Sequence, residues 1–146
     1  METKELEINK KVSGEEKLRD IFTSLTNAEG KKLVEAVKAA VNWFDLHYND
    51  NNRWEVSKQV KINDTVCFYY VLRNCEDLFN YRQFDPEASL IIETKYFGDI
   101  RAYGSGVEGG CTDEELYLFY DMIRYVYKEV KKSRSFFRKR SKNDDI

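Results

Sequence analysis

The chain has 146 residues, of which 42% are hydrophobic and 34% are charged, and its formal net charge is −2. This length suits one globular domain that buries its core without disulfide bonds. The longest uninterrupted apolar run covers residues 66–72, which is too short for a bilayer, so we expect no membrane span. The cysteines at 67, 75 and 111 lack paired spacing, which indicates a reducing, cytoplasmic location.

Charge is distributed unevenly along the chain. Residues 1–75 carry equal numbers of acidic and basic side chains, whereas residues 76–121 carry 11 acids and three bases, a net charge of −8. Residues 122–142 reverse this balance, with nine bases and one acid, a net charge of +8. Such asymmetry is typical of surfaces that steer a partner, and it is equally common on surfaces that are simply solvated.

Two consecutive capping boxes predict two N-terminal helices. Ser13 and Thr26 each stand three residues before a glutamate, the arrangement that satisfies the first backbone donors of a helix. Apolar residues then recur every three or four positions, as on one face of a helix. We expect the first helix over residues 14–25 and the second to end near residue 47.

The middle of the chain changes to the two-residue alternation of β-strands. Four strands are predicted, over residues 53–62, 65–72, 89–97 and 99–104. The segment 75–88 contains the only proline and is expected to connect the two pairs, with one helical turn over residues 76–81.

A third capping box, at Thr112 and Glu115, predicts a long C-terminal helix whose apolar positions run from Leu116 to Val130. The predicted fold class is α+β: two N-terminal helices, a four-stranded, mostly antiparallel sheet, and a long C-terminal helix packed on the sheet. Residues 1–132 form the expected single domain, and residues 133–146 a basic tail that either extends the helix or is disordered.

The loop before this helix, GSGVEGG, matches the dinucleotide-binding pattern G-x-G-x-x-G at Gly104, Gly106 and Gly109. That site needs a helix N-terminus that faces a pyrophosphate and a further strand after the helix. No further strand is predicted here, and Glu108 and the acids of the first helical turn would repel a phosphate. We interpret the glycines as a backbone reversal and expect no cofactor.

Cys111 precedes the predicted helix, a position that favours nucleophilic thiol chemistry, and the only histidine, His47, is the candidate base. A cysteine-dependent enzyme is therefore a third hypothesis. The nearby acids oppose thiolate formation, and a small, partly buried cysteine is the commoner role. The cysteine spacings lack the close pairs of zinc sites, so no metal site is predicted.

The leading hypothesis is a small non-catalytic binding protein of the inhibitor, immunity or anti-defence type. It is expected to dock an acidic, tyrosine-rich face on a protein partner with a basic surface, because tyrosines dominate interfaces and complementary charge selects partners. The predicted partner-binding residues are Glu108, Asp113, Glu114, Glu115, Tyr117 and Asp121.

The alternative is a nucleic-acid-binding protein that uses the basic C-terminal tail, where cations neutralise phosphates and Phe136 and Phe137 stack on bases. The residues predicted for that role are Lys131, Lys132, Arg134, Arg138, Lys139 and Arg140, with Arg124 and Lys128 as additions. A structural interpretation stands beside it, because cations also stabilise the C-terminal end of a helix.

Overall fold

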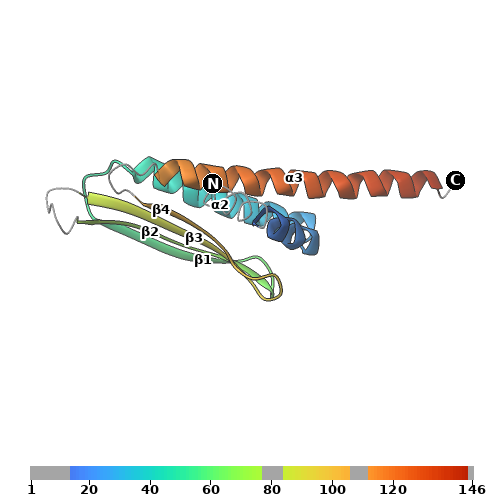
Figure 1. Ribbon diagram of the computed structural model, residues 1–146, viewed down its shortest axis with the longest axis horizontal. Helices are drawn as coiled ribbons and strands as arrows, with labels where there is room; N and C mark the ends of the chain where they lie inside the picture. Colours follow the sequence, from blue (N-terminus) through green and yellow to red (C-terminus); the bar gives the residue numbers. More distant parts are fainter. Residues whose placement is uncertain (1–13, 77–83, 106–111, 145–146) are drawn as a thin grey trace, which may run out of the picture.

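Helices and strands occupy separate layers, with helices packed on one face of a sheet (Figure 1). The computed structural model describes residues 14–76, 84–105 and 112–144. These residues form an N-terminal helix over residues 14–24, followed by α2 (Asn27–His47), β1 (Trp54–Lys61), β2 (Val66–Glu76), β3 (Phe84–Thr94), β4 (Ile100–Ser105) and α3 (Thr112–Asp144). The arrangement confirms the predicted α+β class.

The sheet is an antiparallel meander in which strands follow one another in the order β1-β2-β3-β4. Short turns make this order possible. In the β1–β2 turn, the Asn63 side-chain oxygen accepts hydrogen bonds from the backbone N–H groups of Thr65 and Val66, each at 2.8 Å. This local turn sets the register that places Phe68 opposite both Val60 and Ile92.

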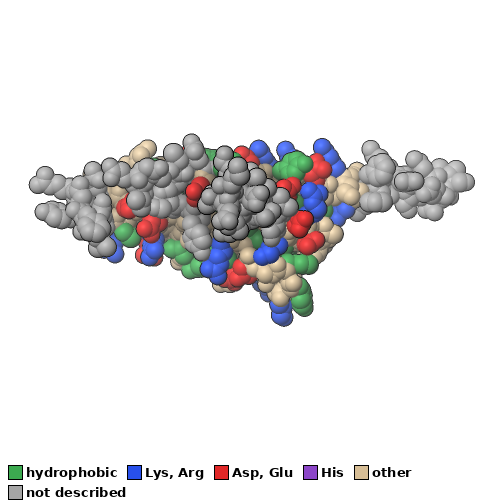
Figure 2. Space-filling view, viewed as in Figure 1, with side chains coloured by type: hydrophobic (Ala, Val, Ile, Leu, Met, Phe, Trp, Pro, Cys, Tyr) green, Lys and Arg blue, Asp and Glu red, His purple; other side chains and the backbone are tan. Residues whose placement is uncertain are grey.

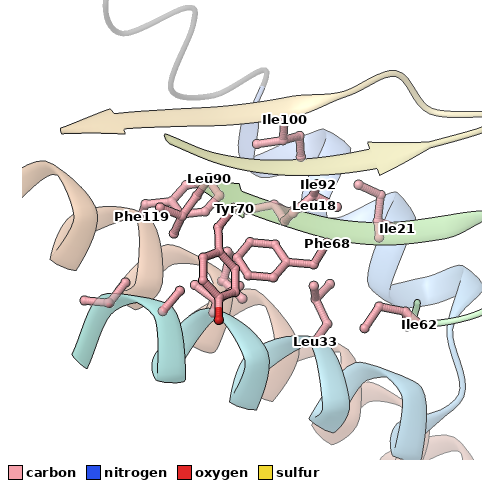
Figure 3. Packing of buried hydrophobic residues seen from close by; sticks show 14 of the residues in the cluster. Leu18, Ile21, Leu33, Ile62, Phe68, Tyr70, Leu90, Ile92, Ile100 and Phe119 are labelled. Carbon is pink, nitrogen blue, oxygen red and sulfur yellow. The ribbon is translucent and has the colours of Figure 1, made fainter. Parts of the chain in front are cut away.

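Alternate residues of the central strands form the core against the helices (Figure 3). On β2 the buried positions are Val66, Phe68, Tyr70 and Leu72, and on β3 they include Ala88, Leu90 and Ile92. Each helix packs an apolar stripe against these strands. The stripes include Leu18, Phe22, Leu33, Phe44, Leu116 and Ile123, all of which are fully or almost fully buried. Each large apolar side chain moved out of water contributes about 1.5–3 kcal/mol, so this layer contact stabilises the fold.

The capping box at the start of α2 is confirmed. Thr26 Oγ1 accepts a hydrogen bond from the Glu29 N–H at 3.1 Å, and the Glu29 carboxylate accepts one from the Thr26 N–H at 2.9 Å. The hydrogen bond from the Thr26 backbone holds the pKa of Glu29 below its usual value. Ser13 and the side chain of Thr112, which belong to the other two predicted boxes, lie outside the described residues.

The prediction that residues 75–88 only connect two pairs of strands is wrong. β2 continues to Glu76 and β3 already begins at Phe84, while β3 ends at Thr94, earlier than expected. Pro86 lies inside β3, opposite Asn74 of β2 and one residue before the described pairing with β4 begins. The rest of the predicted helical turn, residues 77–81, lies outside the described residues.

Helices α2 and α3 run in opposite directions side by side, and a glycine of α2 lies where the two pack closely (Figure 1). Gly30 is buried on α2, and a Cβ atom at this position would lie only 2.9 Å from the Tyr127 ring on α3. It would also lie 3.3 Å from the Phe22 ring, which packs against Tyr127 with ring centroids 5.7 Å apart. Three helices therefore meet at the Gly30 backbone.

We predict that Gly30→Ala lowers the free energy of unfolding by about 1–2 kcal/mol, because crowding against two rings outweighs the better helix propensity of alanine. Gly14→Ala is the matched control, since nothing lies within 4 Å of its added Cβ atom. The control should leave stability unchanged or raise it slightly. Urea denaturation measures both, and an equal gain in the two variants would contradict a close helix contact.

Candidate functional site

The outward side of α3 carries most of the described residues that the sequence predicts for binding. Its core positions, Leu116, Phe119, Ile123, Val126 and Val130, are buried against the rest of the fold. Because an α-helix turns by about 100° per residue, the opposite side presents Tyr117, Asp121, Arg124 and Lys128. All four have exposed side chains.

Large apolar side chains are exposed along the first half of α3. Tyr117 is 37% exposed, Leu118 63% and Tyr125 54%, whereas elsewhere in the described residues only Leu46 and Tyr96 are comparably exposed large hydrophobics. Asp121 lies between them, one helical turn from Tyr117 and from Tyr125. We call Tyr117, Leu118, Asp121 and Tyr125 the α3 patch. Exposed apolar groups gathered on one helix face are typical of an interaction site.

The predicted acidic residues do not all gather on this patch. Glu115 is exposed and stands three residues before Leu118, so it borders the patch on that side, although it lies about 160° around the helix axis from Tyr117. Asp121 lies on the patch, where its carboxylate accepts a hydrogen bond from Arg124 at 3.3 Å. Glu108 and the side chains of Asp113 and Glu114 lie outside the described residues.

One residue predicted to bind nucleic acid, Arg134, instead fastens α3 to the end of the N-terminal helix. Its Nη2 donates hydrogen bonds to the backbone carbonyls of Phe22, Thr23 and Leu25 at 3.1, 2.7 and 2.6 Å. Its Nη1 donates one to the Asn27 side-chain oxygen at 2.8 Å. Carbonyls at a helix C-terminus lack partners within the helix and carry partial negative charge, so a guanidinium fits them well.

Lys131 and Lys132, which the sequence assigns to the same role, are exposed. Lys131 Nζ lies 5.9 Å from the centre of the Tyr127 ring, a distance compatible with a cation–π contact. Arg138, Lys139 and Arg140 fall within α3, and their side chains lie outside the described set.

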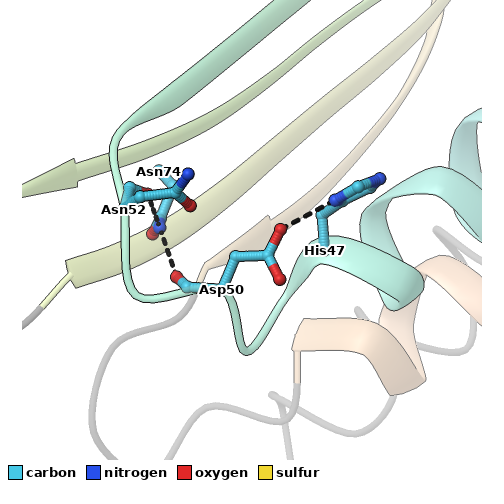
Figure 4. Close-up of polar contacts among 4 residues, drawn as sticks. All are labelled: His47, Asp50, Asn52 and Asn74. Carbon is cyan, nitrogen blue, oxygen red and sulfur yellow. Dashed lines mark hydrogen bonds and ion pairs between the residues drawn. The ribbon is translucent and has the colours of Figure 1, made fainter.

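The candidate base His47 belongs to a polar network that closes the α2–β1 connection (Figure 4). Its Nδ1 lies 2.8 Å from the Asp50 carboxylate, and its ring stacks on Trp43 with centroids 4.0 Å apart. The buried Asn74 side chain donates hydrogen bonds to the backbone carbonyls of Asp50 and Asn52 at 3.0 and 2.6 Å. These contacts give the histidine a structural role at the end of its helix.

Neither described cysteine lies on the helix-covered side of the sheet, where His47 is found. Cys67 and Cys75 are free and half-buried, but they alternate along β2 with the residues that face the helices, so they point to the opposite side of the sheet. Cys111 lies outside the described residues. Within the described ranges, no group of three His, Cys, Asp or Glu residues is placed to hold a metal ion.

The face of the sheet turned away from the helices has mixed, paired charges. Arg73 on β2 binds Glu87 on β3 at 3.3 Å, and Lys61 lies 3.1 Å from Asp64 at the β1–β2 turn. Between them lie half-buried side chains such as Tyr69 and Ile91. This face therefore favours neither sign of charge in a partner.

Comparison with protein-family models, with characterised proteins and with solved structures gives no match for this chain. Among the described helices, none combines the length and apolar character needed to cross a bilayer.

We predict that Arg134→Met lowers the free energy of unfolding by about 2–3 kcal/mol, because the variant removes charged hydrogen bonds and leaves backbone carbonyls without donors. Lys132→Met, an exposed residue of the same helix, is the control and should change stability little. Urea denaturation at two salt concentrations measures both. Equal stability of the two variants would show that the Arg134 contacts do not fasten the helices.

Proposed function

We propose that this chain is a small non-catalytic binding protein that docks on a basic protein surface through the α3 patch. The main observation in support is that Tyr117, Leu118 and Tyr125 are exposed on a helix whose opposite side is buried in the core. Large apolar side chains contribute most to the binding free energy where they become fully desolvated at the centre of an interface. A partner that covers them removes their apolar surface from water.

The spacing of the patch suits a groove or helix on the partner. Leu118 and Tyr125 are seven residues apart, about 10 Å along the axis and almost on the same side of the helix. Asp121 lies between them, and its exposed pair with Arg124 is weak because water screens it. A partner arginine or lysine that desolvates this carboxylate would replace that contact with a stronger one.

The charge of the surrounding sequence supports a basic partner. Residues 76–121 carry a net charge of −8, and α3 begins with Asp113, Glu114 and Glu115. Long-range attraction of this sign accelerates encounter with a positively charged surface and disfavours acidic ones. Inhibitors, immunity proteins and anti-defence proteins act by such docking, and we place this protein in that class.

The same proposal places the protein in the cytoplasm. Cys67 and Cys75 are free thiols at opposite ends of β2, and free thiols persist in reducing compartments.

We expect the double variant Leu118→Ser/Tyr125→Ser to weaken partner binding by more than about 30-fold, because two apolar anchors are lost. Leu46→Ser/Tyr96→Ser is the matched control, since it removes the same side-chain types from sites that are 75% and 73% exposed and lie off α3. The partner is first captured from the native cell with tagged wild-type chain and nuclease, then purified, and its affinity is measured by calorimetry.

A further variant, Asp121→Lys, tests whether electrostatic attraction contributes to partner binding. It should reduce the association rate and make that rate less dependent on salt. The proposal fails if the patch double variant and the control double variant bind the purified partner equally well, or if nuclease abolishes capture.

A further inference from the structure

We propose that the outward side of α3, from Arg124 to the C-terminal end of the helix, binds the phosphate backbone of nucleic acid. Four basic residues with exposed side chains define this basic stripe: Arg124, Lys128, Lys131 and Lys132. Three further basic positions of α3 follow, at Arg138, Lys139 and Lys142, and their side chains lie outside the described set. The stripe meets the α3 patch at Arg124, which pairs with Asp121, and its other residues follow Tyr125, so this proposal does not depend on protein docking.

Helix geometry aligns these residues. At about 100° per residue, the seven positions fall within a sector about 120° wide, opposite the buried positions Ile123, Val126 and Val130. Arg124, Lys128, Lys131 and Lys132 have exposed side chains. Lysine and arginine side chains line the upper edge of the molecule over the middle of α3 (Figure 2).

The requirements of the fold do not explain the stripe. Cations stabilise the negative end of a helix dipole only within its last turn, whereas Lys128, Lys131 and Lys132 stand three or more turns before Asp144. None of these three lysines forms an ion pair with an acidic side chain in the described part of the chain. Like charges three and four residues apart on a helix also repel each other. A polyanion bound along the stripe would remove that repulsion.

Arg134 shows the contrast between a structural and an available cation. It lies about 100° from the centre of the stripe, on the side facing the N-terminal helix, and its donors are occupied by four oxygen atoms of that region. This contact fixes the direction in which α3 leaves the body of the protein. The part of the stripe before Arg134 is therefore anchored to the body of the protein before a ligand arrives, which reduces the entropy lost on binding.

The shape of the molecule leaves the stripe accessible. The C-terminal part of α3 extends beyond the sheet and the other helices (Figure 1). From Arg124 to Lys142 the helix rises about 27 Å, and a helix about 10–12 Å in diameter matches the width of a DNA major groove, about 12 Å. A projecting basic helix thus follows phosphates along a duplex without interference from the sheet.

The acidic start of α3 does not cancel the stripe. Asp121 pairs with Arg124 at the start of the stripe, but it stands eleven residues before Lys132, about 16 Å along the axis. That distance is about two Debye lengths at physiological salt, so the two charges are largely screened from each other. A chain with a net charge of −2 therefore still presents a local cationic surface.

Fluorescence anisotropy with labelled oligonucleotides of about 20 residues per strand tests the proposal on the full chain. Duplex DNA, duplex RNA and single-stranded DNA are titrated between about 50 and 200 mM salt. The test variant is Lys128→Gln/Lys131→Gln/Lys132→Gln. The matched control is Lys31→Gln/Lys32→Gln/Lys38→Gln, which removes the same charge from exposed positions of α2.

We expect the wild-type chain to bind at least one of these nucleic acids with affinity that falls linearly on a log–log plot against salt. The test variant should bind at least about tenfold more weakly at low salt, with a slope smaller by about 2.7, or 0.9 per lost phosphate contact on duplex DNA. The control and the Leu118→Ser/Tyr125→Ser variant should bind like wild type. The nucleic acid that binds most tightly identifies the ligand class.

Three results would overturn the proposal. The first is no binding to any of the three nucleic acids at about 50 mM salt. The second is an equal loss of affinity in the α2 control variant. The third is binding to vesicles that contain phosphatidylserine in the absence of binding to nucleic acid, which would assign the stripe to a membrane surface.

Discussion

The burial of one face of an antiparallel sheet beneath the helix layer is the constraint on which the rest of the structure depends. A meander of four strands has a single apolar face to cover, and α2 and α3 cover it only if they approach each other closely. Gly30 permits that approach, because its missing side chain leaves room for the Tyr127 ring. Because the inner side of α3 is buried in this packing, its other side faces solvent.

Much of this arrangement is predictable from residue patterns, because helix caps and apolar periodicity are local signals. Thr26 with Glu29 fixes the start of α2, and its apolar stripe gives the end at His47. The strand ends near Asn74 and Pro86 are harder to predict from sequence, because asparagine and proline are both common in turns. Asn74 is buried because Asp50 and Asn52 supply backbone acceptors from a distant loop, which no local pattern reveals.

Local residue patterns also predict only part of the candidate binding surfaces. Helical spacing already separates Tyr117, Leu118 and Asp121 from the core side of α3, but the exposed fraction of each side chain comes only from the structure. Among the basic residues, residue type does not distinguish Arg134 from Lys132, although helical spacing places them on different sides of α3. They differ because the last carbonyls of the N-terminal helix lie within reach of Arg134, a contact between residues more than 100 positions apart. Tertiary contacts, more than residue type, decide which cations are available to a ligand.

The Arg134 contact also bears on where the folded unit ends. Val130 is the last buried apolar position of α3 in the described residues, so a shortened chain ending there retains the described apolar core. It would nevertheless lose the guanidinium that satisfies the end of the N-terminal helix. Deletion of the basic residues that follow Val130 therefore changes both the stability of the fold and the charge of the protein. Only a boundary placed beyond residue 134 separates the two effects.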